Sequence, residues 1–301
     1  MKPAAAPQQS LASSFALGAL LAGATCIALS PIWVRVSDVG PTASAFWRVG
    51  LAVPLLWLLC AIAPRSATAP GEGQWKLLVA AGIAFAGDLA FWHWSIKFTS
   101  VANSTLLANL ASIFVTLAMW MICRQRPTGL FLLGLAAALA GVAMLVRTSL
   151  DFSPTGLLGD ALGVITAMFY AWYLLSVKGV RDRGAATLRL MAVTTTVTTV
   201  FLFPVALASG EALAPQSGTG WLILLGLAWI SHSAGQGLIA YALAHLPAAF
   251  SSVSLLFQPV MAAVFAWILL GEPLVGLQVV GGVVVLVGIW LARTGSRTAA
   301  G

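Results

Sequence analysis

The sequence predicts an all-α integral membrane protein, with ten transmembrane helices arranged as two inverted repeats of five. Hydrophobic residues make up 60% of the chain and charged residues only 8%, whereas a soluble domain carries about 25% charged residues. Apolar blocks of about 20 residues recur, which at 1.5 Å per residue span a hydrocarbon layer of roughly 30 Å. Two such blocks flank Gly271-Glu272-Pro273, as expected for membrane helices joined by a tight turn.

An internal repeat relates the two halves of the chain. Five pairs of identical residues share an offset of 147 residues: Trp120/Trp267, Gly129/Gly276, Gly134/Gly281, Gly141/Gly288 and Ser104/Ser251. A fixed offset of this kind indicates duplication, so we expect repeats at 12–147 and 157–292, with short tails at 1–11 and 293–301. The repeated glycines are expected to allow close approach of helices.

The ten expected spans follow in order, each bounded by charged residues, Pro or Gly. They are 12–34, 42–63, 76–96, 101–122, 128–147, 157–177, 187–208, 220–243, 249–270 and 274–292. The boundaries at 97–100 and 244–247 are weak, but they occupy corresponding places in the two halves. A cleaved signal peptide is the alternative for the first block; the repeat needs that block, so we expect an uncleaved helix.

The Lys and Arg residues predict the orientation. With a cytoplasmic N-terminus, eleven of the fifteen fall on that side and four elsewhere, Arg48 among them inside the second span. Such an excess is typical of the cytoplasmic side, so we expect a multi-pass protein of the bacterial inner membrane with both termini cytoplasmic. Five spans per half is an odd number, so the second half must cross in the opposite sense, as in many transporters.

Composition and motifs exclude several classes. The net charge of +7 comes from loop residues rather than one patch, so no nucleic-acid partner is expected. The three cysteines show no metal-ligand spacing. Soluble-enzyme signatures are not evident, and we expect no metal, no cofactor and no enzymatic activity.

Asp88, near the middle of the third span, is the most informative polar residue. A carboxylate at this depth is costly, so Asp88 either binds a substrate amine or takes up a proton. The alternative is a hydrogen bond that holds neighbouring helices together. Trp92 shares the helix face of Asp88, whereas His93 does not; both are candidate site residues, with packing as the alternative for His93.

The eighth and sixth spans add aromatic and polar candidates. Trp229, His232 and Gln236 fall at i, i+3 and i+7, on one helix face. They form either the wall of a substrate cavity or an interhelical hydrogen-bond cluster. Tyr170 and Tyr173 lie deep enough to line a pocket, although aromatic residues at span ends often form an interfacial belt.

Polar stripes run along the fourth and ninth spans. They comprise Thr105, Asn109, Ser112 and Thr116 in the fourth, and Ser251, Ser254 and Gln258 in the ninth. A polar stripe faces water or another helix rather than lipid. Asn109, Ser254 and Gln258 are therefore candidate site residues, with helix packing as the alternative. Pro259 lacks a backbone donor and could leave carbonyls free for a ligand.

Several of these motifs resemble the end of an EamA-type domain. The resemblance is carried by Gln258-Pro259-Val260, by Leu270-Gly271-Glu272-Pro273 with the glycines that follow, and by Pro41 with Arg48. The duplicated pattern resembles the drug/metabolite transporter superfamily over nearly the whole chain, most closely its bacterial amino-acid and metabolite exporters, YddG-like members included. The first copy departs from the motif, with Ser112 in place of Pro259 and Gln125 in place of Glu272.

The resemblance implies a transporter that exports amino acids or related small metabolites by alternating access, although the residues themselves do not show the direction of transport. Solute would bind between the halves, among the third, fourth, sixth, eighth and ninth spans. Aromatic walls and few fixed charges favour a neutral or zwitterionic solute. Proton coupling stays open, and we expect a monomer or weak homodimer. The alternatives are a transporter of a drug, sugar or nucleoside-like solute, a membrane-embedded enzyme and a non-transporting assembly subunit.

Overall fold

The structure, a computed structural model, describes residues 7–63, 72–99, 101–146 and 156–298; residues 1–6 and 299–301 of the expected tails lie outside the described part. Within that part, ten helices are long and apolar enough to cross a membrane, which confirms the expected number of spans. They are Ser14–Val36, Pro41–Ile62, Gly73–Phe98, Ser104–Met121, Gly129–Val146, Gly156–Asp182, Thr187–Ala208, Gly218–Ala242, Ala248–Leu270 and Gly276–Ser296.

Several spans consist of more than one helical segment. The first half contains α1 (Pro7–Ala28) and α2 (Ser30–Val36), α3 (Pro41–Gly50) and α4 (Ala52–Ile62), α5 (Glu72–Phe98), α6 (Val101–Ala108) and α7 (Ala111–Met121), and α8 (Gly129–Val146). The second half contains α9 (Gly156–Asp182), α10 (Thr187–Ala208), α11 (Gly218–Gly226), the π-helix η2 (Leu227–Gln236) and α12 (Gly237–Ala242), α13 (Ala248–Ser254) and α14 (Phe257–Leu270), and α15 (Gly276–Thr298).

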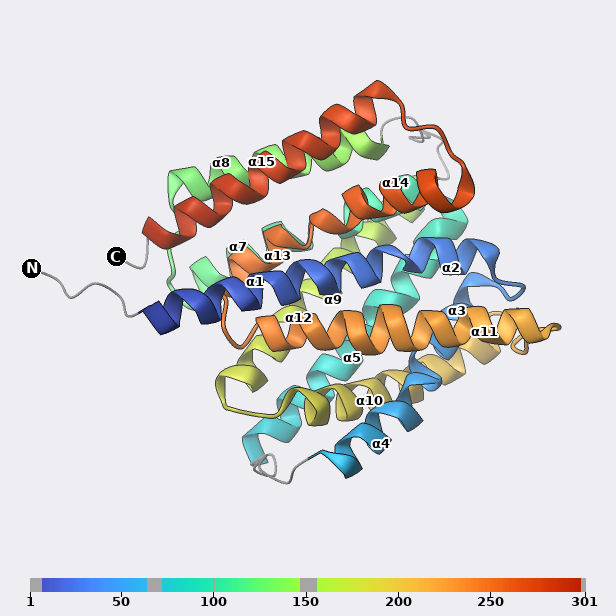
Figure 1. Ribbon diagram of the computed structural model, residues 1–301. Helices are drawn as coiled ribbons and strands as arrows, with labels where there is room; N and C mark the ends of the chain where they lie inside the picture. Colours follow the sequence, from blue (N-terminus) through green and yellow to red (C-terminus); the bar gives the residue numbers. More distant parts are fainter. Residues whose placement is uncertain (1–6, 64–71, 100, 147–155, 299–301) are drawn as a thin grey trace, which may run out of the picture.

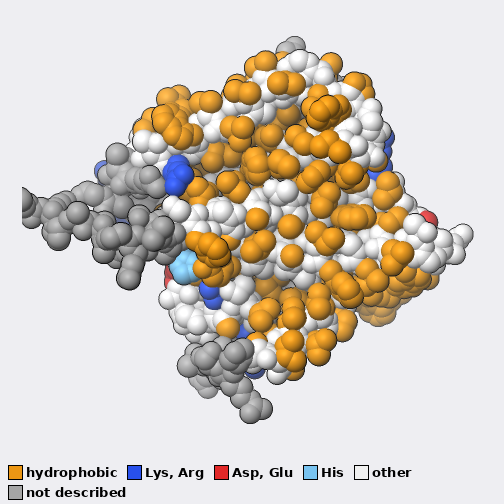
Figure 2. Space-filling model, viewed as in Figure 1, with side chains coloured by type: hydrophobic (Ala, Val, Ile, Leu, Met, Phe, Trp, Pro, Cys, Tyr) orange, Lys and Arg blue, Asp and Glu red, His pale blue; other side chains and the backbone are white. Residues whose placement is uncertain are grey.

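The helices form one bundle, in which α1 begins and α15 ends at the same end (Figure 1). We call this the terminal end; the connections from α2 to α3 and from α14 to α15 lie at the opposite end. The main core forms where α5 packs along α9 and α10. Apolar side chains cover the visible flank of the bundle, and Lys and Arg lie near its edges (Figure 2). Such a surface suits surrounding lipid.

The fourth and ninth spans break at corresponding places. α6 ends at Ala108 and α7 begins at Ala111, whereas α13 ends at Ser254 and α14 begins at Phe257. Both breaks therefore agree with the repeat offset to within one residue. Discontinuous helices of this kind often border the binding site of a transporter.

Ser112, where the second copy has Pro259, does not prevent the break in the fourth span. The Ser112 hydroxyl donates to the carbonyl of Asn109 at 3.0 Å, and the Asn109 amide donates to the carbonyl of Thr105 at 2.8 Å. Each of these carbonyls also accepts a backbone hydrogen bond, from the Asn109 N–H at 3.1 Å and the Ser112 N–H at 3.4 Å, so the side chains add a second donor at the interruption. Pro259 lies in the first turn of α14, where its missing N–H costs no helical hydrogen bond.

α8 and α15 cross closely at glycines. A Cβ added to Gly134 would lie 2.6 Å from the backbone oxygen of Gly288, and one added to Gly141 would lie 2.6 Å from that of Gly281. Real Cβ atoms essentially never come within 3.0 Å of such atoms. The crossing therefore depends on glycine, and the expectation of close helix approach within the bundle is confirmed.

A partly buried carboxylate ties the two halves together at the opposite end. Glu211, between α10 and α11, accepts hydrogen bonds from the Thr42 hydroxyl at 2.8 Å and the Ala43 N–H at 3.0 Å, and pairs with Lys97 at 3.0 Å. We call these four residues the Glu211 clasp. Burial alone would raise the pKa of Glu211, but its hydrogen bonds and Lys97 hold this pKa below the ordinary value.

Candidate functional site

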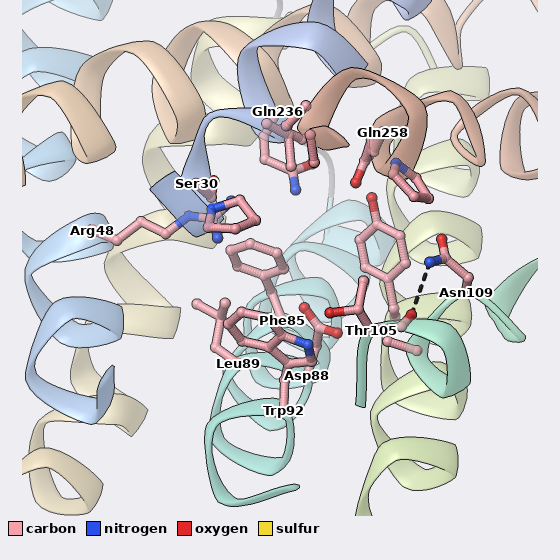
Figure 3. A pocket seen from close by; sticks show the side chains of 17 residues that line it. Ser30, Arg48, Phe85, Asp88, Leu89, Trp92, Thr105, Asn109, Gln236 and Gln258 are labelled. Atoms are coloured by element: carbon pink, nitrogen blue, oxygen red, sulfur yellow. Dashed lines mark hydrogen bonds between the residues drawn. The ribbon is translucent and has the colours of Figure 1, made fainter. Parts of the chain in front are cut away.

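A cavity of about 150 Å³ lies where the two halves of the bundle meet. Its walls come from α1, α2, α3, α5 and α6 of the first half and from α9, η2 and α14 of the second (Figure 3). The lining residues are Ile27, Ala28, Ser30, Pro31, Arg48, Phe85, Asp88, Leu89, Trp92, Thr105, Ala108, Asn109, Tyr170, Gln236, Gln258, Pro259 and Ala262. They occur late in the first span and early in the fourth, so the cavity extends from the middle of the bundle toward the opposite end.

Six of the residues expected from the sequence meet in this cavity: Asp88, Trp92, Asn109, Tyr170, Gln236 and Gln258. Asp88 and Trp92 come from one face of α5, as their spacing of four residues predicts. The break between α6 and α7 places Asn109 on the wall. The hydroxyl of Tyr170 faces the side chains of Gln236 and Gln258, and all three residues belong to the second half.

Two opposite charges face the cavity. Asp88 projects from the middle of α5, and Arg48 enters from α3, with Phe85 between them (Figure 3). The guanidinium carbon of Arg48 lies 6.0 Å from the centre of the Phe85 ring. Within the described part of the chain, the ion pairs closer than 4.0 Å do not include Arg48 or Asp88. The two charges attract each other across the cavity without direct contact.

Buried polar atoms of the cavity wall lack partners. The hydroxyl of Ser30, Nε of Arg48 and Nε2 of Gln258 are buried and make no hydrogen bond. A buried polar atom left without a partner costs about 1–3 kcal/mol. A polar solute or water in the cavity would supply the missing partners.

Tyr173 and His232 lie behind the cavity wall rather than in it. The ring of Phe85 packs against both, with ring centres 4.7 Å from Tyr173 and 5.4 Å from His232. A hydrogen bond of 2.9 Å joins His232 to Thr195 of α10, and the Tyr173 hydroxyl donates to Gln236 at 3.4 Å. These two candidates therefore support wall residues, and we call Phe85, Tyr173 and His232 the aromatic layer.

Three other candidates do not reach the cavity. His93 is buried, and its Nδ1 contacts the carbonyl of Leu89 at 2.6 Å within α5. The Ser254 hydroxyl donates to the carbonyl of Phe250, one turn earlier in its own helix, at 2.9 Å. Trp229 is 46% exposed on the outside of the bundle, and its indole N–H donates to the carbonyl of Leu51.

The π-helix explains the position of Trp229. The spacing of Trp229, His232 and Gln236 predicts one face only for an α-helix, but η2 covers all three. A π-helix has i→i+5 hydrogen bonds and therefore more residues per turn than an α-helix. Trp229, three positions before His232, therefore lies on a different face of the helix from His232. His232 and Gln236, four positions apart, still point inward.

The sequence interpretation missed part of the wall. The first and second spans contribute Ser30, Pro31 and Arg48, although only the third, fourth, sixth, eighth and ninth spans were expected to line a site. Arg48 carried a usable signal, because a charged residue inside an apolar span usually faces a cavity or a partner. Ser30 carried little signal, because a single serine in a membrane helix is common.

A second cavity, of about 570 Å³, lies at the terminal end. Its wall includes Lys178 and Asp182 of α9 and the connection around His245, and it shares no lining residue with the central cavity.

Within the described residues, no group of three His, Cys, Asp or Glu side chains could hold a metal ion. The central cavity can instead bind a small polar molecule through opposite charges and hydrogen bonds.

Comparison with known proteins adds family information. The model of the EamA-like transporter family matches residues 14–147 and 157–294. An "uncharacterized transporter" of Archaeoglobus fulgidus is 27% identical over 272 residues, which cover 86% of this chain and 90% of the relative. A "probable terminal-alkyne amino-acid exporter" of Streptantibioticus cattleyicolor is 25% identical, with 86% and 92% covered. A "probable amino-acid metabolite efflux pump" of Salmonella typhimurium is 27% identical, with 73% and 77% covered.

A solved structure shares the fold. A crystal structure of a protein 15% identical in sequence superposes with a TM-score of 0.75 and covers 95% of this chain and 97% of that chain. Identity this low is informative about the fold alone.

Proposed function

Because the chain belongs to the EamA-like transporter family, we propose that it exports amino acids or related small metabolites by alternating access. The cavity between the halves carries this proposal. It combines a carboxylate, a guanidinium and unpaired polar atoms with aromatic and aliphatic walls. A small solute with charged groups and an apolar side chain fits that combination. Two relatives with names that refer to amino-acid export support the solute class.

Two features of the bundle support alternating access. The central cavity extends toward the opposite end, and a second cavity that shares none of its lining residues lies at the terminal end. The matching breaks in the fourth and ninth spans fit two halves with inverted orientation, between which solute would bind. In this proposal the structure represents a state that faces the opposite end, and rocking of the halves would open the path through the second cavity.

The proposed setting is the bacterial inner membrane, with the terminal end in the cytoplasm. The excess of Lys and Arg expected at that end supports this orientation. The central cavity would then face the periplasm, where an exporter releases its solute. Asp88, the carboxylate in the cavity, is the group in reach of the solute that could also carry a proton.

Purified protein in liposomes tests the proposal. A panel of labelled amino acids, sugars and nucleosides is loaded, and their release is followed with protein-free liposomes as the control. We expect saturable release of one or more amino acids. If sugars or nucleosides were moved and amino acids were not, the proposed substrate class would be wrong. If nothing in the panel moved, the transporter proposal would lose its support.

A further inference from the structure

Arg48 places a positive charge in the wall of the central cavity. It belongs to α3, well inside the second span, and only 8% of its surface is exposed. A charged side chain at this depth is costly unless it meets an opposite charge or water. The partner of Arg48 is therefore informative about what the cavity holds.

The protein itself leaves Arg48 incompletely paired. Its Nε makes no hydrogen bond, and among the described residues no carboxylate lies within 4.0 Å of its guanidinium. The ring of Phe85, 6.0 Å away, gives only a weak cation–π contact at this distance. Asp88 attracts Arg48 from across the cavity.

A second polar atom without a partner lies on the same side. Arg48 extends from α3 toward Ser30 at the start of α2 (Figure 3), and the buried Ser30 hydroxyl also makes no hydrogen bond. Several guanidinium N–H groups and one hydroxyl donor thus surround one region of the cavity. Donors without acceptors form a site for an anionic group.

We propose that Arg48, together with Ser30, binds the carboxylate of the transported solute, while Asp88 on the other side of Phe85 receives its ammonium group. The planar guanidinium matches a carboxylate through two parallel hydrogen bonds. One positive and one negative group in the wall match a solute that carries one charge of each sign. The substrate class is then a small zwitterion with an apolar side chain. This inference rests on the proposed function, since it concerns the solute of the same cavity.

Binding to the purified wild-type protein gives the first test. Titration calorimetry compares L-leucine with L-leucinamide, which lacks the carboxylate, and with 4-methylpentanoate, which lacks the amine. If another amino acid binds more tightly, that amino acid and its own analogues replace leucine. Removal of either charge should weaken binding about tenfold or more, because it removes hydrogen bonds to a charged group. Equal affinity for leucine and leucinamide would overturn the proposal.

Substitution of Arg48 gives the second test. Arg48→Gln should weaken leucine binding about tenfold or more and leave the weak leucinamide binding unchanged, so that the two compounds become equivalent. Arg48→Lys keeps the charge without the planar fork and should give an intermediate loss. Arg124→Gln, the same change in an exposed loop, is the matched control and should change neither affinity. A folded Arg48→Gln protein that still prefers leucine as the wild type does would contradict the proposal.

Failure of this inference and failure of the proposed function give different results. Equal binding of leucine and leucinamide, together with transport in liposomes, would refute the role of Arg48 alone. Carboxylate-dependent binding without any transport would refute the proposed function alone. If Arg48→Gln did not fold, the wild-type comparison would still decide the role of the carboxylate.

Discussion

Asp88 and Arg48 give the cavity its chemical character, because both are ionisable groups at a depth where lipid offers no compensation for a charge. Neither is neutralised by a direct contact with the other. Both side chains therefore remain available to a solute. The polar residues around them, such as Asn109 and Gln258, add orientation rather than charge.

Asp88→Asn is expected to lower the rate of amino-acid transport about tenfold or more, because a neutral amide attracts an ammonium group less than a carboxylate does. Release from proteoliposomes measures the rate. Glu272→Gln removes a carboxylate from the turn between α14 and α15, where Glu272 pairs with Arg35, and serves as the control because it lines neither cavity. Wild-type rates in Asp88→Asn would rule out a role in binding. An unchanged pH dependence in the variant would rule out proton coupling through Asp88.

At the scale of single residues, the structure places six of the eleven candidate residues in one cavity and the other five outside it. Asp88 and Trp92 share a regular α-helical face, so their spacing gave their joint position correctly. His93 lies on another face of α5, where its Nδ1 contacts the carbonyl of Leu89 one turn earlier. Trp229 was misplaced because local winding changes the face of a helix, and the sequence carries no plain signal for a π-helix.

Among the elements, the α8–α15 pair depends most directly on residue size. Gly134→Val should lower the thermal unfolding temperature in detergent by several degrees, because the new side chain meets the backbone of α15, which cannot rotate away. Gly276→Ala, at the start of α15 where a Cβ would meet nothing within 4 Å, is the control and should change little. Equal stability of both variants would contradict the close crossing.

The Glu211 clasp predicts a pH-dependent contribution to stability. Its folded-state pKa lies below the ordinary value, so its contribution is complete at neutral pH and disappears as pH falls through that lowered pKa. Thermal melts between neutral pH and about pH 3 measure it. Glu211→Gln should lose about 2 kcal/mol at neutral pH and show less dependence on acid than the wild type.

Glu272→Gln is the matched control for the clasp. Glu272 pairs with Arg35, but the two side chains are 44% and 64% exposed. An exposed pair contributes about 0–1 kcal/mol, so this variant should melt close to the wild type. The clasp would be unsupported if Glu211→Gln and Glu272→Gln behaved alike at every pH.

The positions of the helices were predictable, whereas their interruptions were only partly so. Length and apolarity identify a span because a lipid environment leaves the backbone few alternatives to a helix. Pro259, which the sequence singled out for its missing backbone donor, lies just after the break in the ninth span. The matching break between α6 and α7 has no proline to mark it, so the sequence pattern does not reveal it.

For the whole molecule, duplication made the fold predictable, and packing made the site only partly predictable. The 147-residue repeat implied two five-helix halves, and ten spans are present. The position of the cavity depends on how the first and second spans pack against α5 and α14. Those contacts join distant parts of the chain, so Ser30 and Arg48 became visible as wall residues only in the folded bundle.

The central claim is that the cavity is a water-filled binding site for the solute. Ala262 lines it, and Leu286 of α15 is 47% exposed on the outside of the bundle. Each is changed to Cys in a protein whose Cys26, Cys60 and Cys123 are replaced by serine. A water-soluble, membrane-impermeant thiol reagent is then applied from the side of the opposite end, which is the periplasmic side in the proposed orientation. We expect Ala262→Cys to react, a transported amino acid to slow that reaction, and Leu286→Cys to stay unmodified. An Ala262→Cys protein that is as unreactive as Leu286→Cys, or that the amino acid does not protect, would contradict the account.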